Sequence, residues 1–566
     1  MHPLPVPSTV MAPNIVKAPH QENITEAQEA APAIPKVIWH KSPNMRKLYF
    51  FAAILCINSA TTGYDGSMLN AMQFFPSWES YFNKPSSDTL GRLSAMYSIG
   101  SIASLIFVPI LSDRFGRRCP IIVGCTIMIL AAAVQAASQS LPMFEGARFF
   151  MGFGNSLAQL SSPLLLTEIC HPQHRGRVTA VYNCLWNVGA LICSWISFGT
   201  QNIGSNWAWR IPTLIQAFPS VICITFIWWI PESPRWLISK EKNDKALHIL
   251  GYYHADGNAD DATVQFEYEE IKETIRMEFI AKKSSSYLDF FKTKGNRYRL
   301  FLIISAGLFS QWSGNALVSY YANKIYTSAG VDGPKAGLGL DGGNKVLSLI
   351  ISISCALLCD RIGRRPLFLA ATGGMLLCFM AATISSAQYA KTNDKGTGIA
   401  VVLFVWLHGV AYAFAWSGLL IAYTVEILPF KIRAKGMMIM NVAVQVALVI
   451  NNYVNPIPLD GAWKGTEWKL YCVYTAWIAV ELVIVYLFYV ETKYVPNSLY
   501  LHEFQTNIDF RGPTLEEIAR IFDGDNAEVG AVHVKDAPGL ANDHYDMHEK
   551  TYAEKQEVMT TAIEKS

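Results

Sequence analysis

Two charged residues interrupt long apolar stretches of the sequence, and together they could bind and release a proton. Asp65 lies in the apolar stretch 48–69, and Arg148 lies in the stretch 143–166. An ionised side chain in the middle of a bilayer costs about 2.5–3.5 kcal/mol, so an acid retained there indicates a function or a fixed partner. Apolar surroundings disfavour an ionised carboxylate, whereas a nearby guanidinium favours it. We predict that Asp65 takes up and releases a proton as its distance from Arg148 changes. The alternative is a static structural ion pair.

Amide and aromatic side chains in the other apolar stretches are suited to a neutral ligand rich in hydroxyl groups. Amides can bind two neighbouring hydroxyls, and aromatic rings stack on the apolar face of a ring-shaped ligand. The candidate ligand-binding residues are Asn183, Gln311, Asn315, Tyr320, Tyr321 and Trp416. For any single amide, a hydrogen bond between helices is the competing interpretation. For Trp416, core packing or lipid contact is an equal alternative, and His408 is expected to be a packed, hydrogen-bonded side chain.

The stretches that carry these residues have the length of membrane-spanning helices. Hydrophobic residues make up 51% of the 566 residues and charged residues 16%, against roughly 25% charged residues in soluble domains. A helix of about 20 residues crosses the ~30 Å hydrocarbon core of a bilayer. Twelve stretches qualify: 48–69, 92–112, 119–138, 143–166, 178–199, 210–230, 299–327, 344–360, 366–387, 397–425, 436–456 and 470–490. We predict an all-α membrane protein, embedded in the lipid bilayer, with twelve transmembrane helices in two six-helix bundles.

Polar segments divide the chain into five parts: an N-terminal tail (1–46), a first bundle (47–231), a linker with amphipathic helices (232–298), a second bundle (299–492) and a C-terminal tail (493–566). Basic residues gather after the even-numbered spans, which places those ends, the linker and both termini in the cytosol. The net charge of +2 gives no reason to expect a nucleic-acid partner. The eleven cysteines lie in or beside apolar stretches, so neither disulfides nor a metal site are expected.

Charged motifs recur in the same order in the two halves. Each follows an even-numbered span of the first half and returns after the equivalent span of the second: Asp113-Arg-Phe-Gly-Arg-Arg118 with Asp360-Arg-Ile-Gly-Arg-Arg365, Glu168 and Arg175 with Glu426 and Arg433, and Glu232-Ser-Pro-Arg235 with Glu491-Thr-Lys493. Duplicated halves around a central site are an architecture of secondary transporters.

The repeated charges suit a gate where cytosolic helix ends converge. Arginine forks and carboxylates there would pair across helices when the inner side closes and separate when it opens. The candidate gate residues are Asp113, Arg117, Arg118, Glu168, Arg175, Glu232, Arg235, Asp360, Arg364, Arg365, Glu426, Arg433 and Glu491. A purely topological role for the arginines is the alternative, although the positive-inside rule does not require the accompanying acids.

The ordered set of motifs resembles the sugar porter family of the major facilitator superfamily over residues 48–522. The motifs that carry the resemblance are Gly63-Tyr64-Asp65, Asp113 to Arg118, Gly146-Ala-Arg148 with Gly152 and Gly154, Pro231 to Arg235, Glu491-Thr-Lys493, and Leu515 to Phe522. Gly63-Tyr-Asp-Gly-Ser67 with Gln311-Trp-Ser-Gly-Asn315 is most similar to fungal lactose-permease-type and hexose porters.

The resemblance also shows departures. In the proton symporters that the chain resembles, an aspartate and an arginine at the positions of Asp65 and Arg148 form the coupling pair. Facilitative relatives from animals often carry asparagine at the Asp65 position, whereas some fungal facilitators keep the acid. Asn315 sits one residue earlier than the usual asparagine and Asn183 stands where many relatives have glutamine, which alters the expected size of the ligand site. In the tenth span, Ser417-Gly418 replaces a usual Gly-Pro. Pro109 replaces a usual glycine and is predicted to kink the second span.

The resemblance implies a secondary active transporter in the plasma membrane that imports a sugar, such as a hexose or a lactose-type disaccharide. The implied mechanism is proton symport with alternating access, by a monomer with no cofactor besides the coupling proton. A facilitative sugar uniporter and a sugar sensor with little transport remain alternatives. An enzyme is not expected, because no arrangement of nucleophile and base stands out.

Overall fold

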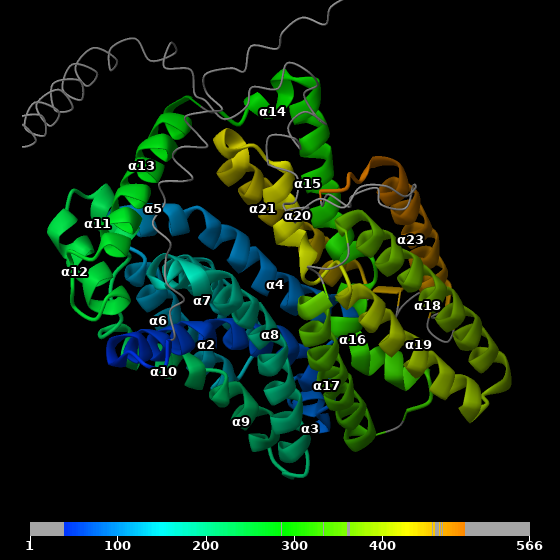
Figure 1. The fold of residues 1–566 in the computed structure, drawn as a ribbon. Coiled ribbons are helices and arrows are strands. Elements are labelled where there is room, and N and C mark those ends of the chain that lie inside the picture. The colour runs from blue at the N-terminus through cyan, green and yellow to red at the C-terminus, as the bar shows by residue number, and fades with distance from the viewer. Residues whose placement is uncertain are drawn as a thin grey trace, which may run out of the picture.

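Each of the twelve predicted spans coincides with one helix or with two consecutive helices of the computed structural model (Figure 1). The structure describes residues 39–492, except 285, 332, 359–362, 456, 459–462, 464, 465 and 467. The N-terminal half consists of α2 (Pro43–Met72), α4 (Ser87–Leu105), α5 (Phe107–Phe115), α6 (Arg118–Ala136), α7 (Leu141–Ile169), α8 (Pro172–Thr200), α9 (Trp207–Ile215) and α10 (Phe218–Ile227), with the short α3 (Pro76–Tyr81) after α2. The C-terminal half consists of α15 (Lys294–Trp312), α16 (Asn315–Ser328), α17 (Pro334–Leu358), α18 (Arg364–Thr392), α19 (Lys395–Ala413), α20 (Leu419–Ile427), α21 (Phe430–Val454) and α23 (Trp468–Phe488). The predicted all-α fold with two six-span bundles is confirmed.

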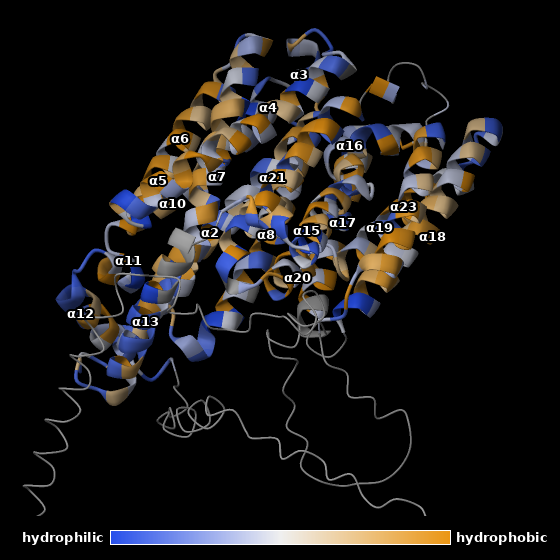
Figure 2. Ribbon diagram, turned by 90° about the horizontal axis from the view of Figure 1, so that it is seen from above, coloured by the Kyte–Doolittle hydropathy of each residue, from blue (hydrophilic) through white to orange (hydrophobic). Residues whose placement is uncertain are grey.

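The linker between the halves is helical as well. It contains α11 (Pro234–Ser239), α12 (Asn243–His254), α13 (Ala262–Ser284) and α14 (Asp289–Lys292). Figure 2 shows α11, α12 and α13 at one end of the bundle and α3 at the opposite end. We call these ends the linker face and the α3 face. Helix α15 begins before the predicted end of the linker at residue 298, and the tails 1–46 and 493–566 lie mostly or wholly outside the described residues.

Local sequence signals account for where several helices begin. The Ser42 hydroxyl accepts a hydrogen bond from the Met45 N–H at 3.2 Å, and Pro43 occupies the first helical position of α2. Asp394 caps α19 in the same way, accepting from the Thr397 N–H at 3.2 Å. Such caps satisfy backbone donors that the first turn of a helix leaves without partners.

The second span is broken between α4 and α5, which meet at an angle of 43°. Pro109 lies at the third position of α5. Its ring nitrogen cannot donate to the carbonyl of Leu105, and its ring crowds the preceding turn. The predicted kink is confirmed.

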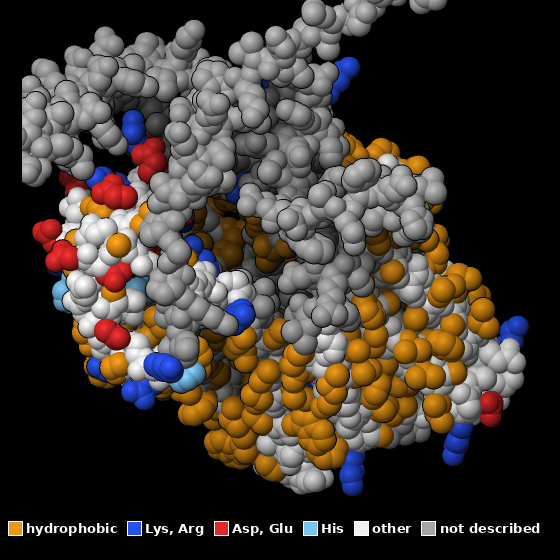
Figure 3. Space-filling view, in the orientation of Figure 1, with side chains coloured by type: hydrophobic (Ala, Val, Ile, Leu, Met, Phe, Trp, Pro, Cys, Tyr) orange, Lys and Arg blue, Asp and Glu red, His pale blue; other side chains and the backbone are white. Residues whose placement is uncertain are grey.

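Eight helices of the described residues are long and apolar enough to cross a membrane, and the bent pair α4 and α5 makes a ninth span. The three spans that fall short of this hydropathy test are α2, α7 and α17, although each has 25 residues or more. These three helices carry buried charged residues: Asp65, Arg148, Asp341 and Lys345. Hydrophobic side chains cover the flank of the bundle, and charges gather over the linker helices (Figure 3).

A histidine cluster joins the linker to the N-terminal half. His171 caps α8, is 2% exposed and lies with its ring 5.2 Å from that of His254 on α12. His254 bonds through Nδ1 to Glu267 of α13 at 2.7 Å and through Nε2 to the Ile169 carbonyl at 3.1 Å. The ring of His174 also lies near His171, at 5.8 Å. The linker therefore packs on the bundle through a buried, titratable contact.

We predict that acidification weakens this contact. Burial lowers the pKa of His171 from 6.5 to about 4, and the nearby His254, His174 and Arg175 lower it further. Glu267 raises this pKa, but its effect is smaller than that of burial. A neutral His171 is thus required by the fold, so its contribution is complete above pH 6.5 and is lost as the pH falls toward 4. The expected loss is about 1.4 kcal/mol per pH unit in that window.

Thermal unfolding of the purified protein at pH 7.5 and at pH 5.5 measures this loss. His171→Asn keeps a good cap residue but cannot titrate. The variant should therefore show a smaller drop in melting temperature than the wild type between the two pH values. Equal drops in both proteins would contradict the role of His171.

Candidate transport site

Glycines bring the helices around Asp65 into close contact. A Cβ atom at Gly63 would lie 1.8 Å from the backbone oxygen of Trp186 on α8, and one at Gly152 would lie 1.9 Å from the backbone oxygen of Tyr97 on α4. Any larger residue would force these helices apart. The Gly63-Tyr64-Asp65 motif thus holds α2 against α8, and Gly152 holds α7 against α4.

Asp65 and Arg148 lie fully buried in the N-terminal half, both 0% exposed. They are close enough to interact electrostatically. However, neither oxygen of Asp65 and none of the three guanidinium nitrogens of Arg148 has a hydrogen-bond partner among the described residues. The structure therefore brings the predicted pair together without closing the ion pair.

Neutral groups surround the two charges. The Arg148 guanidinium lies over the ring of Tyr97, 5.0 Å from its centroid, where the electron-rich ring face attracts a cation. The Tyr97 hydroxyl is held by the amide of Asn155 at 2.5 Å. The buried amide of Gln216 faces Asp65 without completing a hydrogen bond. Arg148 is thus positioned by an aromatic ring, which leaves its hydrogen-bond donors unused.

The seventh span is broken opposite these charges, between α15 and α16. Gly314 adopts a left-handed conformation with φ of 93°, which is strained for residues with a Cβ. A Cβ there would also lie 2.5 Å from the ring of Phe379. The carbonyl of Ser313 is satisfied from outside the helix by His408 Nε2 at 2.9 Å. His408 is thus packed and hydrogen-bonded, as predicted.

Gln311 and Asn315 flank this break. The Gln311 amide nitrogen donates to the Ser310 hydroxyl at 3.2 Å, and Asn315 accepts from the Ser319 hydroxyl at 3.4 Å. Both side chains are half-buried, so they keep hydrogen-bonding capacity beyond these local contacts. Asn451 of α21 donates to the backbone carbonyl of Gln311 at 2.9 Å and supports the end of α15.

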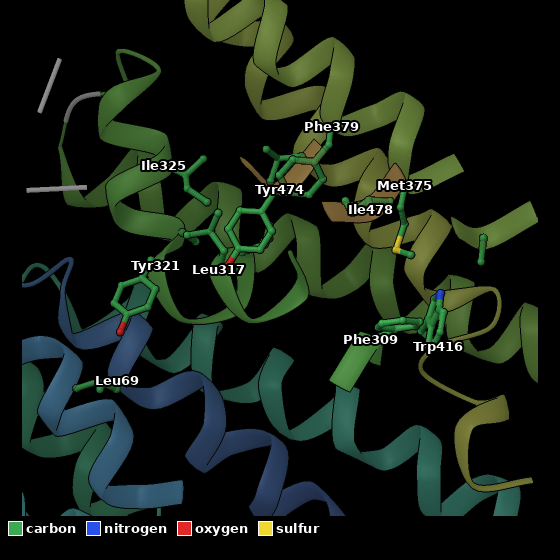
Figure 4. Close-up of a cluster of buried hydrophobic side chains, with 14 of the residues drawn as sticks. Leu69, Phe309, Leu317, Tyr321, Ile325, Met375, Phe379, Trp416, Tyr474 and Ile478 are labelled. Carbon is green, nitrogen blue, oxygen red and sulfur yellow. The ribbon is translucent and has the colours of Figure 1, made fainter. Parts of the chain in front are cut away.

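The two candidate tyrosines have different surroundings. Tyr320 lies near Arg148 across the interface between the halves. Tyr321 is fully buried, and its hydroxyl donates to the Asn452 carbonyl at 2.7 Å and lies 3.4 Å from the Ser94 hydroxyl. Figure 4 shows Tyr321 directed toward the N-terminal half, near Leu69. Tyr320 therefore lies near the charged pair, whereas Tyr321 connects the two halves.

Trp416 and Asn183 do not join this group. Trp416 is 1% exposed, packs beside Phe309 and Phe368, and donates to the Thr372 hydroxyl at 3.2 Å (Figure 4). In this structure Trp416 is therefore packed in the core. Asn183 occupies an exposed position of α8, and its neighbour one turn later, Asn187, is the amide that contacts the other half.

The two halves are joined toward the α3 face and separated at the linker face. Gln73, at the end of α2, donates to the carbonyl of Tyr320 at 3.0 Å and accepts from Asn323 at 2.6 Å. On the linker face the surface is hollowed between α5 and α21 (Figure 3). This recess opens toward the interior of the bundle.

The repeated charged motifs form the same network in each half. Arg117 donates to both oxygens of Glu168, at 3.1 and 3.3 Å, and its backbone N–H donates to Glu232 at 3.0 Å. Arg364 likewise donates to Glu426 at 3.0 Å, and its backbone N–H donates to Glu491 at 2.8 Å.

The last arginine of each motif, Arg118 or Arg365, completes the network. The backbone N–H of Arg118 donates to Glu232 at 3.4 Å, and its side chain donates to the Trp228 carbonyl near the end of the sixth span. In the other half, the backbone N–H of Arg365 donates to Glu491 at 3.1 Å, and its side chain donates to the Tyr486 carbonyl near the end of the twelfth span. Burial raises the pKa of Glu232, although these backbone donors counteract it. The internal duplication inferred from sequence is thus visible in the contacts.

These networks lie within each half in this structure. Arg117, which also donates to the Ser112 carbonyl at 3.1 Å, and Glu168 tie the second, third and fourth spans of one half together. Other predicted gate residues have local contacts: Asp113 with Arg117 at 3.5 Å and Arg235 with Glu278 at 2.9 Å. Arg175 lies in the first turn of α8, and its backbone N–H donates to the His171 carbonyl at 3.1 Å. Arg433 donates to the Leu428 carbonyl at 3.3 Å, and Asp360 lies outside the described residues.

We predict that Glu168→Gln lowers stability by about 2 kcal/mol, less than the 3–5 kcal/mol of a fully buried pair, because the Arg117 and Glu168 side chains are 17% and 9% exposed. Thermal unfolding in detergent measures the change. The control is Glu278→Gln, which breaks the more exposed pair with Arg235 (30% and 51% exposed) and should cost under about 1 kcal/mol. Equal effects of the two variants would show that the network does not stabilise the half.

Sequence reasoning missed several residues of the site. Outside this site it also missed Asp341 and Lys345, which are buried on α17; Asp341 lies before the predicted span 344–360, and Lys345 lies within it. Tyr97, Asn155 and Gln216 were missed because nothing in their spacing distinguishes them from core residues. Cys56, Cys119, Cys125, Cys170, Cys184, Cys193, Cys223, Cys378 and Cys472 are free. The described residues hold no cluster of three potential metal ligands.

Comparison with known proteins agrees with this architecture. Residues 51–504 match the family model described as Sugar (and other) transporter. The MFS-type transporter oryC of Aspergillus oryzae is 29% identical over 457 residues, which cover 79% of this chain and 83% of that protein. The high-affinity glucose transporter of Kluyveromyces lactis is 26% identical over 474 residues, covering 80% and 84%.

The fold is similar to solved structures of the xylose transporter XylE from E. coli. Its inward open conformation has a TM-score of 0.67 at 20% identity, covering 84% of this chain and 100% of that chain. The proton:xylose symporter XylE bound to 6-bromo-6-deoxy-D-glucose has a TM-score of 0.65 at 20% identity, covering 85% and 100%. The chain belongs to the sugar transporter family of the major facilitator superfamily. It is a multi-pass membrane transporter with twelve spans, rather than an enzyme.

Proposed function

We propose that the protein imports a sugar, a hexose or a lactose-type disaccharide, together with a proton. The observation that carries this proposal is the buried pair Asp65 and Arg148, which lies unbonded in the N-terminal half. An acid without a hydrogen-bonded partner at this depth is a group that can take a proton. The amides of Gln311 and Asn315, at the break in the seventh span, offer hydroxyl-binding groups from the other half.

The proposed cycle follows from these positions. A proton on Asp65 removes its attraction for Arg148, so the electrostatic balance in the N-terminal half changes with proton binding. A sugar bound at Gln311 and Asn315 would be enclosed by Tyr320, which also interacts with Arg148. Proton and sugar would thus act on the same interface between the halves, which is the requirement for coupled alternating access.

The gate and the orientation belong to the same proposal. With the linker face in the cytosol, the recess is the inward exit. The arginine networks of the two halves would come together when this side closes, and carboxylates such as Glu168 and Glu426 would then meet arginines of the opposite half, including Arg433. Both termini would be cytosolic, the two tails would flank the bundles, and the monomer would reside in the plasma membrane.

Sugar uptake into proteoliposomes with a pH-sensitive dye in the medium tests the symport. The expected result is alkalinisation of the medium when sugar is added, in proportion to uptake. Downhill sugar flux without any pH change would instead identify a facilitator. Saturable binding with negligible flux would identify a sugar sensor. A panel of unlabelled hexoses, pentoses, polyols and disaccharides in competition with one transported sugar would define the substrate.

A further inference from the structure

Asp341 is a buried acid that neither the charged pair nor the ligand-binding amides use. It lies on α17 in the C-terminal half and is 1% exposed. Both carboxylate oxygens accept hydrogen bonds from the other half: Oδ1 from the Asn70 amide of α2 at 3.2 Å, and Oδ2 from the Ser194 hydroxyl of α8 at 2.5 Å. One carboxylate is therefore held by two helices of the opposite half.

The surrounding seam between α8 and α17 is close-packed. A Cβ at Gly337 would lie 2.2 Å from the ring of Phe74, which follows α2, and one at Gly342 would make ordinary van der Waals contact, 3.4 Å, with the Trp195 ring of α8. Further along the seam, Asn187 donates to the Ser352 hydroxyl at 3.0 Å. The small residues let α17 approach the N-terminal half closely enough for short polar side chains to bridge the gap.

Lys345 lies one turn from Asp341 on the same face of α17, because residues four apart are neighbours on a helix. It is 7% exposed and makes no hydrogen bond or ion pair within the described part of the chain. Both side chains lie near Cys193 of α8. If the halves separate here, Asp341 loses both donors, and Lys345 is the cation beside it.

These bonds also connect to the proton site. Asn70 lies on α2, the helix that carries Asp65, five residues further along. Gln73 on the same helix end bonds the seventh span through Tyr320. Of these hydrogen bonds between the halves, those to Asp341 involve a carboxylate, and hydrogen bonds with an ionised partner are roughly twice as strong as neutral ones.

We propose that Asp341 is the latch that keeps the α3 face closed, a positioning residue that sets how often the halves part on that face. This proposal rests on the alternating access described above. It does not require that the cargo be a sugar or that a proton be coupled.

The test uses a reporter cysteine behind the latch. Ser94 on α4 is 1% exposed, next to Tyr321 at the interface. Ser94→Cys is labelled in intact cells by a membrane-impermeant sulfonated thiol reagent, with the full-length chain lacking this substitution as the background for native cysteines. Asp341→Ala should raise the labelling rate about tenfold, roughly what one charge-assisted hydrogen bond is worth. Asp341→Asn keeps the shape and should give a smaller increase.

The matched control is Asn187→Ala, which removes the neutral bond to Ser352 in the same seam and should change labelling less than about threefold. The double variant Asn70→Ala with Ser194→Ala should reproduce the Asp341→Ala effect, and adding Asp341→Ala to it should have little further effect. These variants also carry the test if Asp341→Ala does not fold, as judged by size-exclusion chromatography. Unchanged labelling in Asp341→Asn and in the Asn70, Ser194 double variant would overturn the latch. Because labelling needs neither sugar nor a proton gradient, failure of the symport proposal would leave this result readable.

Discussion

Replacing Asp65 by asparagine is expected to abolish sugar accumulation while sugar exchange across the membrane continues. Asparagine keeps the shape of the side chain but cannot carry a proton. One proton moving through 100 mV supplies about 2.3 kcal/mol, which sustains roughly a fifty-fold sugar gradient. In Asp65→Asn the ratio of internal to external sugar concentration should fall to one. Labelled sugar in energised vesicles measures accumulation, and counterflow with unlabelled sugar measures exchange.

Asp65→Glu is the matched control, because glutamate retains a titratable carboxylate at the same position on α2. It should keep a sugar ratio above one, with slower uptake because the longer side chain meets closely packed surroundings. Size-exclusion chromatography must first show that Asp65→Asn folds, since the substitution leaves Arg148 as a buried charge without a counter-charge. Accumulation by folded Asp65→Asn at the wild-type ratio would remove the acid from the coupling mechanism and favour the structural interpretation of the pair.

Replacing Gln311 by alanine is expected to raise the KM for the transported sugar by roughly 10- to 100-fold. The amide flanks the break at Gly314 and is half-buried, with a 3.2 Å bond to Ser310 as its local contact. Loss of two neutral hydrogen bonds to sugar hydroxyls costs about 1–3 kcal/mol, which corresponds to a 5- to 150-fold change in affinity. Initial uptake rates over a range of sugar concentrations measure this change.

Gln388→Ala is the control for Gln311→Ala. Gln388 is an exposed amide near the end of α18, remote in sequence and position from the break, and its loss should leave KM within twofold. Asn451→Ala provides a second comparison, because it removes the support of the Gln311 backbone but not the amide itself. An unchanged KM in Gln311→Ala would assign this amide to packing between helices, and the ligand site would have to lie elsewhere.

Residue type and local spacing were sufficient for the helices and for the repeat. Twelve apolar stretches predicted the spans, and Pro109 predicted the kink between α4 and α5. Asp65 and Arg148 stood out because charges in such stretches are costly. Glu168 and Glu426 were recognised as equivalent because an arginine, Arg175 or Arg433, follows each of them seven residues later in the sequence. All these properties depend on neighbours along the chain, which the sequence displays directly.

Contacts between distant segments could not be derived in this way. The aromatic side chain of Trp416 made it a candidate for stacking on the ligand, yet it packs beside Phe309 inside the C-terminal half. The arginine motifs suggested pairs that cross the gate, whereas Arg117 bonds Glu168 and Glu232 within its own half. A helical position specifies a face but not the helix that it meets, because that choice depends on the packing of the whole bundle.

The sequence by itself thus determined that Asp65 and Arg148 are costly charges inside a duplicated twelve-helix bundle. Only the tertiary structure decided that the two lie buried near each other without a closed ion pair. It also revealed Asp341 between the halves, at a position that lies before the predicted span 344–360. Both outcomes have one physical reason: the partners come from helices far apart in the chain, and close packing through small residues determines which of them meet.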